Sequence, residues 1–112
     1  MYRPKASTMA EFGYKGSSIF RTAYYNRYYK CLPSKNTVLS ICFIDDPNTF
    51  CLFRLSEKEY RDFENGRLSL VPPGCCNASG GESIENNTIV YKKNIKNLDQ
   101  LKKALMVVEK LF

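Results

Sequence analysis

Two runs of β-branched, aromatic and other apolar residues stand out in the middle of the chain. They cover Thr37–Ile44 and Thr49–Leu55, and the turn-forming sequence Asp-Asp-Pro-Asn separates them. Because apolar runs joined by such a turn are typical of a β-hairpin, we expect an antiparallel pair over 37–55. Both faces of the first run are apolar, so we expect that strand to be central or covered on both sides.

A short helix is predicted directly after this hairpin. Ser56-Glu-Lys-Glu59 has the pattern of a capping box, in which the serine accepts from an early helical N–H and the glutamate reaches back. The helix should bury Tyr60 and Phe63 and end at Asn65-Gly66, where glycine can adopt the left-handed conformation. The next residues, 67–71, then read as a short strand that ends before Pro72-Pro73.

A second amphipathic helix is predicted at the end of the chain. Asn97 and Gln100 repeat the capping pattern at its start, after a further strand candidate at 88–95. Apolar residues then fall on one helical stripe: Leu98, Leu101, Leu105, Val108 and Phe112. Val107 and Leu111 widen this stripe beyond one packing face, so a homodimer through the C-terminal helix is one interpretation.

The first third of the chain has a less regular pattern. Residues 1–16 contain Pro4, Gly13 and Gly16 without a hydrophobic period, so we expect an extended arm. From Ser17 or Ser18 onward, aromatic residues recur at helical spacing until Pro33, and we expect a helix that ends at Leu32: the stripe is Phe20, Tyr24, Tyr28 and Cys31. Residues 72–87 have no period and many turn formers, which predicts a long loop.

These elements predict the fold class. We expect a single α+β domain over 1–112, with a three- to four-stranded antiparallel or mixed sheet. Its covering layer should consist of the N-terminal helix, the short middle helix and the C-terminal amphipathic helix. A chain of 112 residues is long enough for one domain with its own core.

Composition favours a cytoplasmic protein. No stretch approaches the roughly 18 uninterrupted apolar residues of a membrane helix, and the polar N-terminus does not have the pattern of a signal peptide. The five cysteines include an adjacent pair, Cys75-Cys76, and an odd count favours reduced thiols. A four-residue turn would place Cys42 opposite Cys51, where a disulfide is geometrically compatible, but two buried thiols packing as small hydrophobes are favoured.

Charge is distributed unevenly along the chain. Residues 1–36 carry seven Lys or Arg against one acid, and six of the eight tyrosines also lie there. The remaining 76 residues carry ten charges of each sign, so the formal net charge of +6 comes entirely from the first third. Such asymmetry concerns the choice of partner rather than the fold.

Catalytic and metal-binding classes are disfavoured by the residue types present. The chain has no histidine, the commonest general base and the usual partner of a nucleophilic Ser or Cys. The adjacent Cys75-Cys76 lacks the gap that lets both thiolates reach one zinc ion, although a redox role in the loop stays open. We therefore expect a protein that is not an enzyme and that uses no metal or cofactor.

The hypothesis that remains is a binding module with a basic, tyrosine-rich surface. Arginine and lysine neutralise phosphates, and tyrosine offers a face on which an unpaired base stacks, so single-stranded nucleic acid or RNA is the first expectation. The alternative is a small inhibitor or adaptor that grips an acidic protein surface, because tyrosine and arginine are also enriched at protein interfaces. A pocket for a small anionic ligand is a third possibility. The expected contact residues are Arg21, Tyr25, Arg27, Tyr29 and Lys30.

Overall fold

The computed structural model describes residues 2–16, 27–43, 47–68 and 88–111. Their elements follow one another in this order: α1 (Ala6–Glu11), β1 (Lys15–Gly16), β2 (Arg27–Leu32), a 3₁₀ turn (Pro33–Lys35), β3 (Thr37–Cys42), β4 (Asn48–Arg54), α2 (Glu57–Glu64), β5 (Thr88–Lys93) and α3 (Leu98–Lys110). The expected loop at 72–87 lies outside the described residues.

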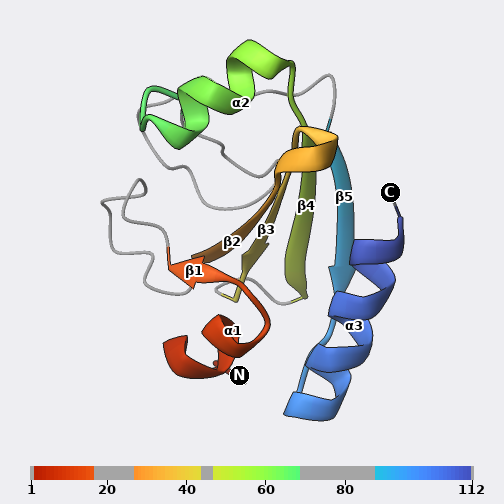
Figure 1. The fold of residues 1–112 in the computed structure, drawn as a ribbon. Helices are drawn as coiled ribbons and strands as arrows, with labels where there is room; N and C mark the ends of the chain where they lie inside the picture. The colour runs from red at the N-terminus through yellow and green to blue at the C-terminus, as the bar shows by residue number, and fades with distance from the viewer. Residues whose placement is uncertain (1, 17–26, 44–46, 69–87, 112) are drawn as a thin grey trace.

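The strands form one antiparallel sheet. Its order is β1-β2-β3-β4-β5, so each strand pairs with its neighbours in sequence (Figure 1). This confirms the predicted α+β class and the antiparallel sheet, but the sheet has five strands instead of three to four. The additional strands come from the N-terminal third, where we had predicted a helix and an arm.

The hairpin predicted over 37–55 is confirmed, with a different register. Cys42 pairs with Thr49 and Ser40 with Cys51, so Cys42 and Cys51 are not opposite each other. The pairing is therefore shifted by two residues from the predicted one. All six residues of β3 are buried, as the apolar character of both its faces predicted.

The helix predicted to end at Leu32 is wrong for residues 27–32, which form β2. The rest of that prediction, 17–26, lies outside the described residues. Successive residues of a strand face opposite sides of the sheet, so Tyr28 and Lys30 face one side and Tyr29 faces the other. Because both faces of β2 are covered, its sequence lacks the apolar–polar alternation that identifies a half-exposed strand.

The N-terminal segment is not an extended arm. Residues 6–11 form α1, and the side chains of Met9 and Tyr14 are 0% and 2% exposed. The helix has only six residues and no side-chain cap, and Met9 is its one buried residue. A helix this short contributes too few apolar positions for a period to be visible in the sequence.

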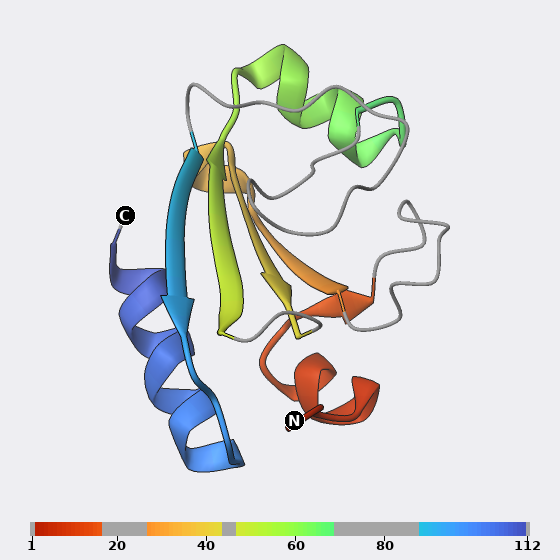
Figure 2. The same cartoon turned by 180° about the vertical axis from the view of Figure 1, so that it is seen from behind.

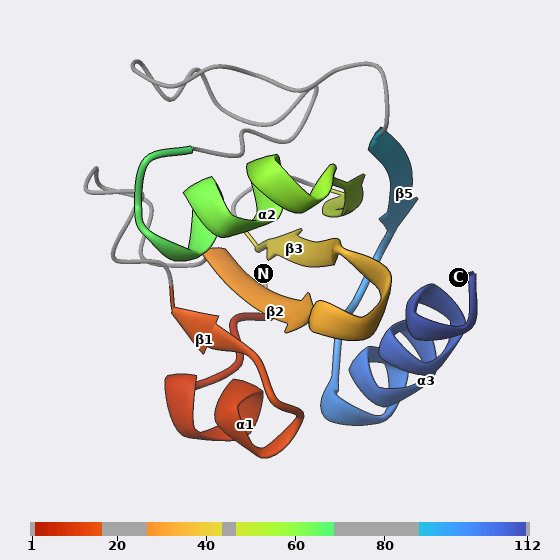
Figure 3. The same cartoon turned by 45° about the horizontal axis from the view of Figure 1, so that its top comes forward.

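The helices lie on the two faces of the sheet. Figures 1 and 2 show α1 and α3 on one side and α2 on the other, and Figure 3 shows α2 lying across the strands. The larger core lies beneath α1 and α3 and joins Met9, Phe50 and Leu101 among others. A smaller core beneath α2 contains Val38, Phe53, Tyr60 and Phe63.

The predicted capping signals are confirmed. Ser56 Oγ accepts from Glu59 N at 3.1 Å, and Ser56 N donates to Glu59 Oε1 at 2.9 Å. The helix α2 buries Tyr60 and Phe63, and Gly66 has the positive φ (+71°) expected after a helix. Beyond it, residues 67 and 68 lie in no strand, so the short strand predicted at 67–71 is wrong there, and 69–71 lie outside the described residues.

The C-terminal helix begins as predicted. Asn97 Oδ1 accepts from Gln100 N at 2.9 Å, whereas Gln100 Oε1 accepts from Lys96 N instead of from Asn97 N. The buried face of α3 consists of Leu101, Ala104, Leu105 and Val108. Val107 and Leu111 are each 46% exposed, so they lie outside the face that packs on the sheet.

The packing of the N-terminal segment can be tested by truncating Met9. We expect Met9→Ala to lower the free energy of unfolding by about 2–5 kcal/mol, because it removes a fully buried side chain from the larger core. Urea denaturation followed by circular dichroism measures this change. Glu11→Ala, at an exposed position of the same helix, is the matched control, and equal effects of the two changes would contradict the packing of α1.

Candidate functional site

The three expected contact residues that the structure describes, Arg27, Tyr29 and Lys30, do not form one exposed patch. Arg21 and Tyr25 lie outside the described residues. Arg27 is 1% exposed and lies on the α2 side of the sheet, near the Cys51 thiol, whose pKa is raised by burial, an effect that the positive charge of Arg27 only partly offsets. The described Arg27 side chain is therefore part of the interior.

Tyr29 also makes an internal contact. Its ring meets the ring of Phe63 edge-on, with 5.5 Å between the centroids and 89° between the planes. Burial raises the pKa of the Tyr29 hydroxyl, as does the Cys31 thiol beside it. This edge-to-face arrangement fixes α2 on the sheet, and the Tyr29 ring is half-buried rather than open as a stacking platform.

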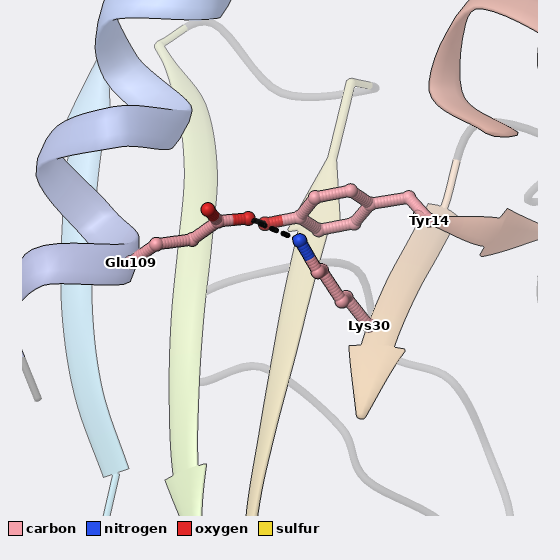
Figure 4. Close-up of polar contacts among 3 residues, drawn as sticks. All are labelled: Tyr14, Lys30 and Glu109. Carbon is pink, nitrogen blue, oxygen red and sulfur yellow. Dashed lines mark hydrogen bonds and ion pairs between the residues drawn. The ribbon is translucent and has the colours of Figure 1, made fainter. Parts of the chain in front are cut away.

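Lys30 takes part in a polar clasp, which we define as Tyr14, Lys30 and Glu109 (Figure 4). Lys30 Nζ donates to Glu109 Oε1 at 2.8 Å, and the Tyr14 hydroxyl donates to the same oxygen at 3.4 Å. Lys30 Nζ also lies 5.6 Å from the centroid of the Tyr14 ring. The clasp joins the segment before β1, the strand β2 and the last turn of α3.

The environment of the clasp keeps Tyr14 neutral. Burial raises the pKa of Tyr14, and the charge of Glu109 and the hydrogen bond to it raise that pKa further. The side chains of Lys30 and Glu109 are 27% and 33% exposed, so solvent screens their ion pair only in part. This arrangement stabilises the packing of α3 and leaves Lys30 engaged within the protein.

Burial raises the pKa of two of the described cysteine thiols, Cys31 and Cys51, which disfavours their use as nucleophiles. Cys31, Cys42 and Cys51 are free, and burial raises the pKa of Cys51 to about 12 from an ordinary value of 9.0. A protonated thiol at neutral pH is a poor nucleophile. Cys75 and Cys76 lie outside the described residues.

Metal and membrane sites are likewise missing from the part of the chain that the structure describes. Within residues 2–16, 27–43, 47–68 and 88–111, no group of three or more Cys, Asp or Glu side chains could hold a metal ion. None of the helices in these same segments is both long enough and apolar enough to cross a membrane.

Exposed apolar side chains are concentrated in the last two described elements. The large hydrophobic residues that are more than a third exposed in the described segments lie in β5, in α3 or directly after α3: Ile89, Val90, Leu98, Met106, Val107 and Leu111. Met106 reaches 58% exposure on the outer side of α3, opposite the face that packs on the sheet. Grouped exposed apolar residues of this kind are typical of interaction sites.

Lysines are interspersed with these apolar residues along the chain. Six exposed lysines lie within the same stretch of chain: Lys92, Lys93, Lys96, Lys102, Lys103 and Lys110. We call the exposed residues Ile89, Val90, Lys92 and Lys93 of β5, with Lys102, Met106, Val107 and Lys110 of α3, the β5–α3 surface. By contrast, residues 54–68, which include α2, carry four basic and four acidic side chains.

Sequence reasoning missed this surface because charge was summed over too long a segment. Residues 88–111 carry six lysines against two acids. This excess of positive charge disappears in a count over residues 37–112, because Asp45, Asp46, Glu82 and Glu85 offset it. A count over blocks of about 25 residues would have detected the second basic segment. The exposed state of Ile89 and Val90 has no comparable sequence signal, because both residues are typical of buried strands.

Comparison of the chain with protein-family models, with curated proteins and with solved structures finds no match.

The structural role of Lys30 predicts a measurable coupling. In a double-mutant cycle with Lys30→Met and Glu109→Gln, we expect a coupling free energy of about 1 kcal/mol, because the pair is partly shielded from water. The control is the exposed Lys103–Asp99 pair, 3.1 Å apart, for which we expect about 0.3–0.5 kcal/mol. Urea denaturation gives both values. A Lys30–Glu109 coupling no larger than the control would contradict the clasp.

The raised pKa of Tyr14 predicts a loss of stability at alkaline pH. Above the ordinary tyrosine pKa of 10.0, the unfolded chain releases the Tyr14 proton while the folded chain retains it. The free energy of unfolding of the wild type should therefore fall relative to Tyr14→Phe, by up to about 1.4 kcal/mol per pH unit above pH 10. Denaturation curves of both proteins from pH 8 to 11 test this. Parallel pH profiles would contradict it.

Proposed function

We propose that this chain is a non-catalytic binding module that recognises an acidic protein partner through the β5–α3 surface. The observation that carries the proposal is that the exposed large apolar side chains and six exposed lysines all lie within residues 88–111, which contain β5 and α3. Apolar side chains contribute affinity once they are buried against a partner, while the lysines select and attract a surface of opposite charge.

A protein partner is favoured over single-stranded nucleic acid by the type of apolar residue. Binding of unpaired bases relies on open aromatic faces, and the described candidate for that role, Tyr29, packs against Phe63. The apolar members of the β5–α3 surface are Ile89, Val90, Met106 and Val107, which are aliphatic or thioether side chains. Such side chains fit the apolar centre of a protein interface, where methionine is enriched.

We further propose that the interaction takes place in the cytoplasm. The three described cysteines are free thiols, and two of them, Cys42 and Cys51, are fully buried. Reduced thiols are typical of proteins in a reducing compartment.

The proposal predicts that neutralising the lysines of the β5–α3 surface weakens partner binding. The variant replaces Lys92, Lys102 and Lys110 with glutamine. Its matched control replaces Lys5, Lys58 and Arg67, which are exposed on other elements, and lowers the net charge equally. Tagged proteins are used to capture partners from a nuclease-treated extract of the source organism, and affinity is then measured with the purified partner.

We expect the wild type to capture a protein whose binding persists after nuclease treatment and which, once purified, binds the wild type directly. Its affinity for the lysine variant should fall about tenfold, since each lysine contributes about 0.5 kcal/mol, whereas the control variant should stay within about twofold. Capture that nuclease abolishes would favour nucleic acid and contradict the proposal. Equal affinities of the two variants, or no captured protein, would also overturn it.

A further inference from the structure

The strand β5 has an open edge among the described elements. It pairs with β4 through six successive one-to-one pairs, and no described strand lies on its other side. In an antiparallel ladder, alternate residues of an edge strand direct both their N–H and C=O groups away from the neighbouring strand. These groups form a template to which an extended chain can add as a further strand.

The first part of β5 is not protected against such pairing. Natural edge strands are blunted by bulges, prolines or charges placed along the strand. Here the pairing from Thr88 to Lys93 contains no bulge, and the two lysines occupy only its last two positions. Ile89 and Val90 are 38% and 39% exposed, so the unprotected half of the edge is also apolar.

On each face of β5, an apolar side chain comes before a lysine along the strand. Ile89 lies opposite Leu52 and therefore on the α1 and α3 side, where Lys93 also lies. Val90 lies opposite Cys51 on the α2 side, where Lys92 also lies. On each face, an apolar position is thus followed by a lysine nearer the C-terminal end of the strand.

Building on the proposed function, we propose that an extended acidic segment of the partner protein adds antiparallel to the edge of β5. Residues 88–96 contain three lysines and no acid, and opposite charges on directly opposed residues of two strands attract. Antiparallel pairing then defines the sequence pattern of the segment. Read from its N-terminus, two acidic residues face Lys93 and Lys92, any residue faces Tyr91, and two apolar residues face Val90 and Ile89.

A second copy of this chain is a weaker occupant of the same edge. In a pairing of β5 with itself, residues 88–111 of each copy carry a formal charge of +4, from six lysines and two acids. This repulsion disfavours self-association. Measurement of the molar mass by light scattering decides the matter, and a dimer lost on changing Val90→Glu would overturn the acidic-partner proposal.

The proposed segment can be identified with a displayed library of random decapeptides selected on the purified full chain. We expect enrichment of two acidic residues followed, after one residue, by two apolar residues. Selection on the Lys92→Glu, Lys93→Glu variant should replace the acidic preference with a basic one. Selection on Lys102→Gln, Lys110→Gln should leave the pattern unchanged, because these lysines lie on α3.

Backbone pairing is tested with a synthetic peptide of the enriched sequence. Fluorescence anisotropy should show at least a tenfold loss of affinity for the Lys92→Glu, Lys93→Glu protein, whose unchanged circular dichroism spectrum confirms folding. N-methylation of the peptide, one amide at a time, should weaken binding at alternate positions only, because only alternate N–H groups face β5. An enriched sequence without the acidic pattern, the absence of any enriched peptide, or insensitivity to N-methylation would each overturn strand addition.

Binding of the captured partner to two lysine variants distinguishes failure of strand addition from failure of the proposed function. If the captured protein partner binds the Lys92→Glu, Lys93→Glu chain as tightly as the wild type but loses affinity for Lys102→Gln, Lys110→Gln, the binding function stands. In that case the partner contacts α3, and strand addition at β5 is wrong.

Discussion

The burial of both faces of β3 is the constraint on which the rest of the structure depends. Every residue from Thr37 to Cys42 is buried, so a layer must cover each side of the sheet. The helix α2 provides one layer, and α1 with α3 provides the other (Figures 1 and 2). The helices in the described part of the chain do not cover its five strands evenly, and the edge strand β5 keeps side chains of both its faces in contact with water.

The position of a strand within the sheet therefore decides what its side chains do. The strands β3 and β5 both begin with threonine followed by β-branched or aliphatic residues, and their local sequences alone would predict similar burial. In β3, Val38 and Leu39 are 0% and 1% exposed, whereas Ile89 and Val90 in β5 are more than a third exposed. The difference arises from strand order, which no local pattern encodes.

The same distinction separates what the sequence could predict from what it could not. The starts of α2 and α3 were predicted correctly, because Ser56 with Glu59 and Asn97 with Gln100 interact within three residues of each other. The strand β2 was misread as a helix, because its two covered faces hide the alternation that marks a strand. The hairpin was predictable from composition, whereas the register of its strands, with Cys42 opposite Thr49, was not.

The candidate site was harder to predict than the fold. The role of Lys30 depends on Glu109, 79 residues further along the chain. A count of local charge therefore includes Lys30 among the lysines free to bind a partner, although in the folded protein it is paired with Glu109. Arg27 presents the same difficulty, since an arginine that is 1% exposed is indistinguishable in sequence from a surface arginine. The sequence identified the basic residues, but it could not identify which of them face water.

Folding also makes the outer side of α3 more positive. The helix contains two carboxylates, and each is engaged by a lysine: Glu109 by Lys30 of β2, and Asp99 by Lys103 one turn away. The ion pairs of the described residues leave Lys102 and Lys110 without carboxylate partners on the same helix. Because the clasp draws Glu109 toward the sheet, the contact that stabilises the packing of α3 also removes negative charge from its outer side. Stability and the proposed recognition of an acidic partner are thus coupled through a single carboxylate.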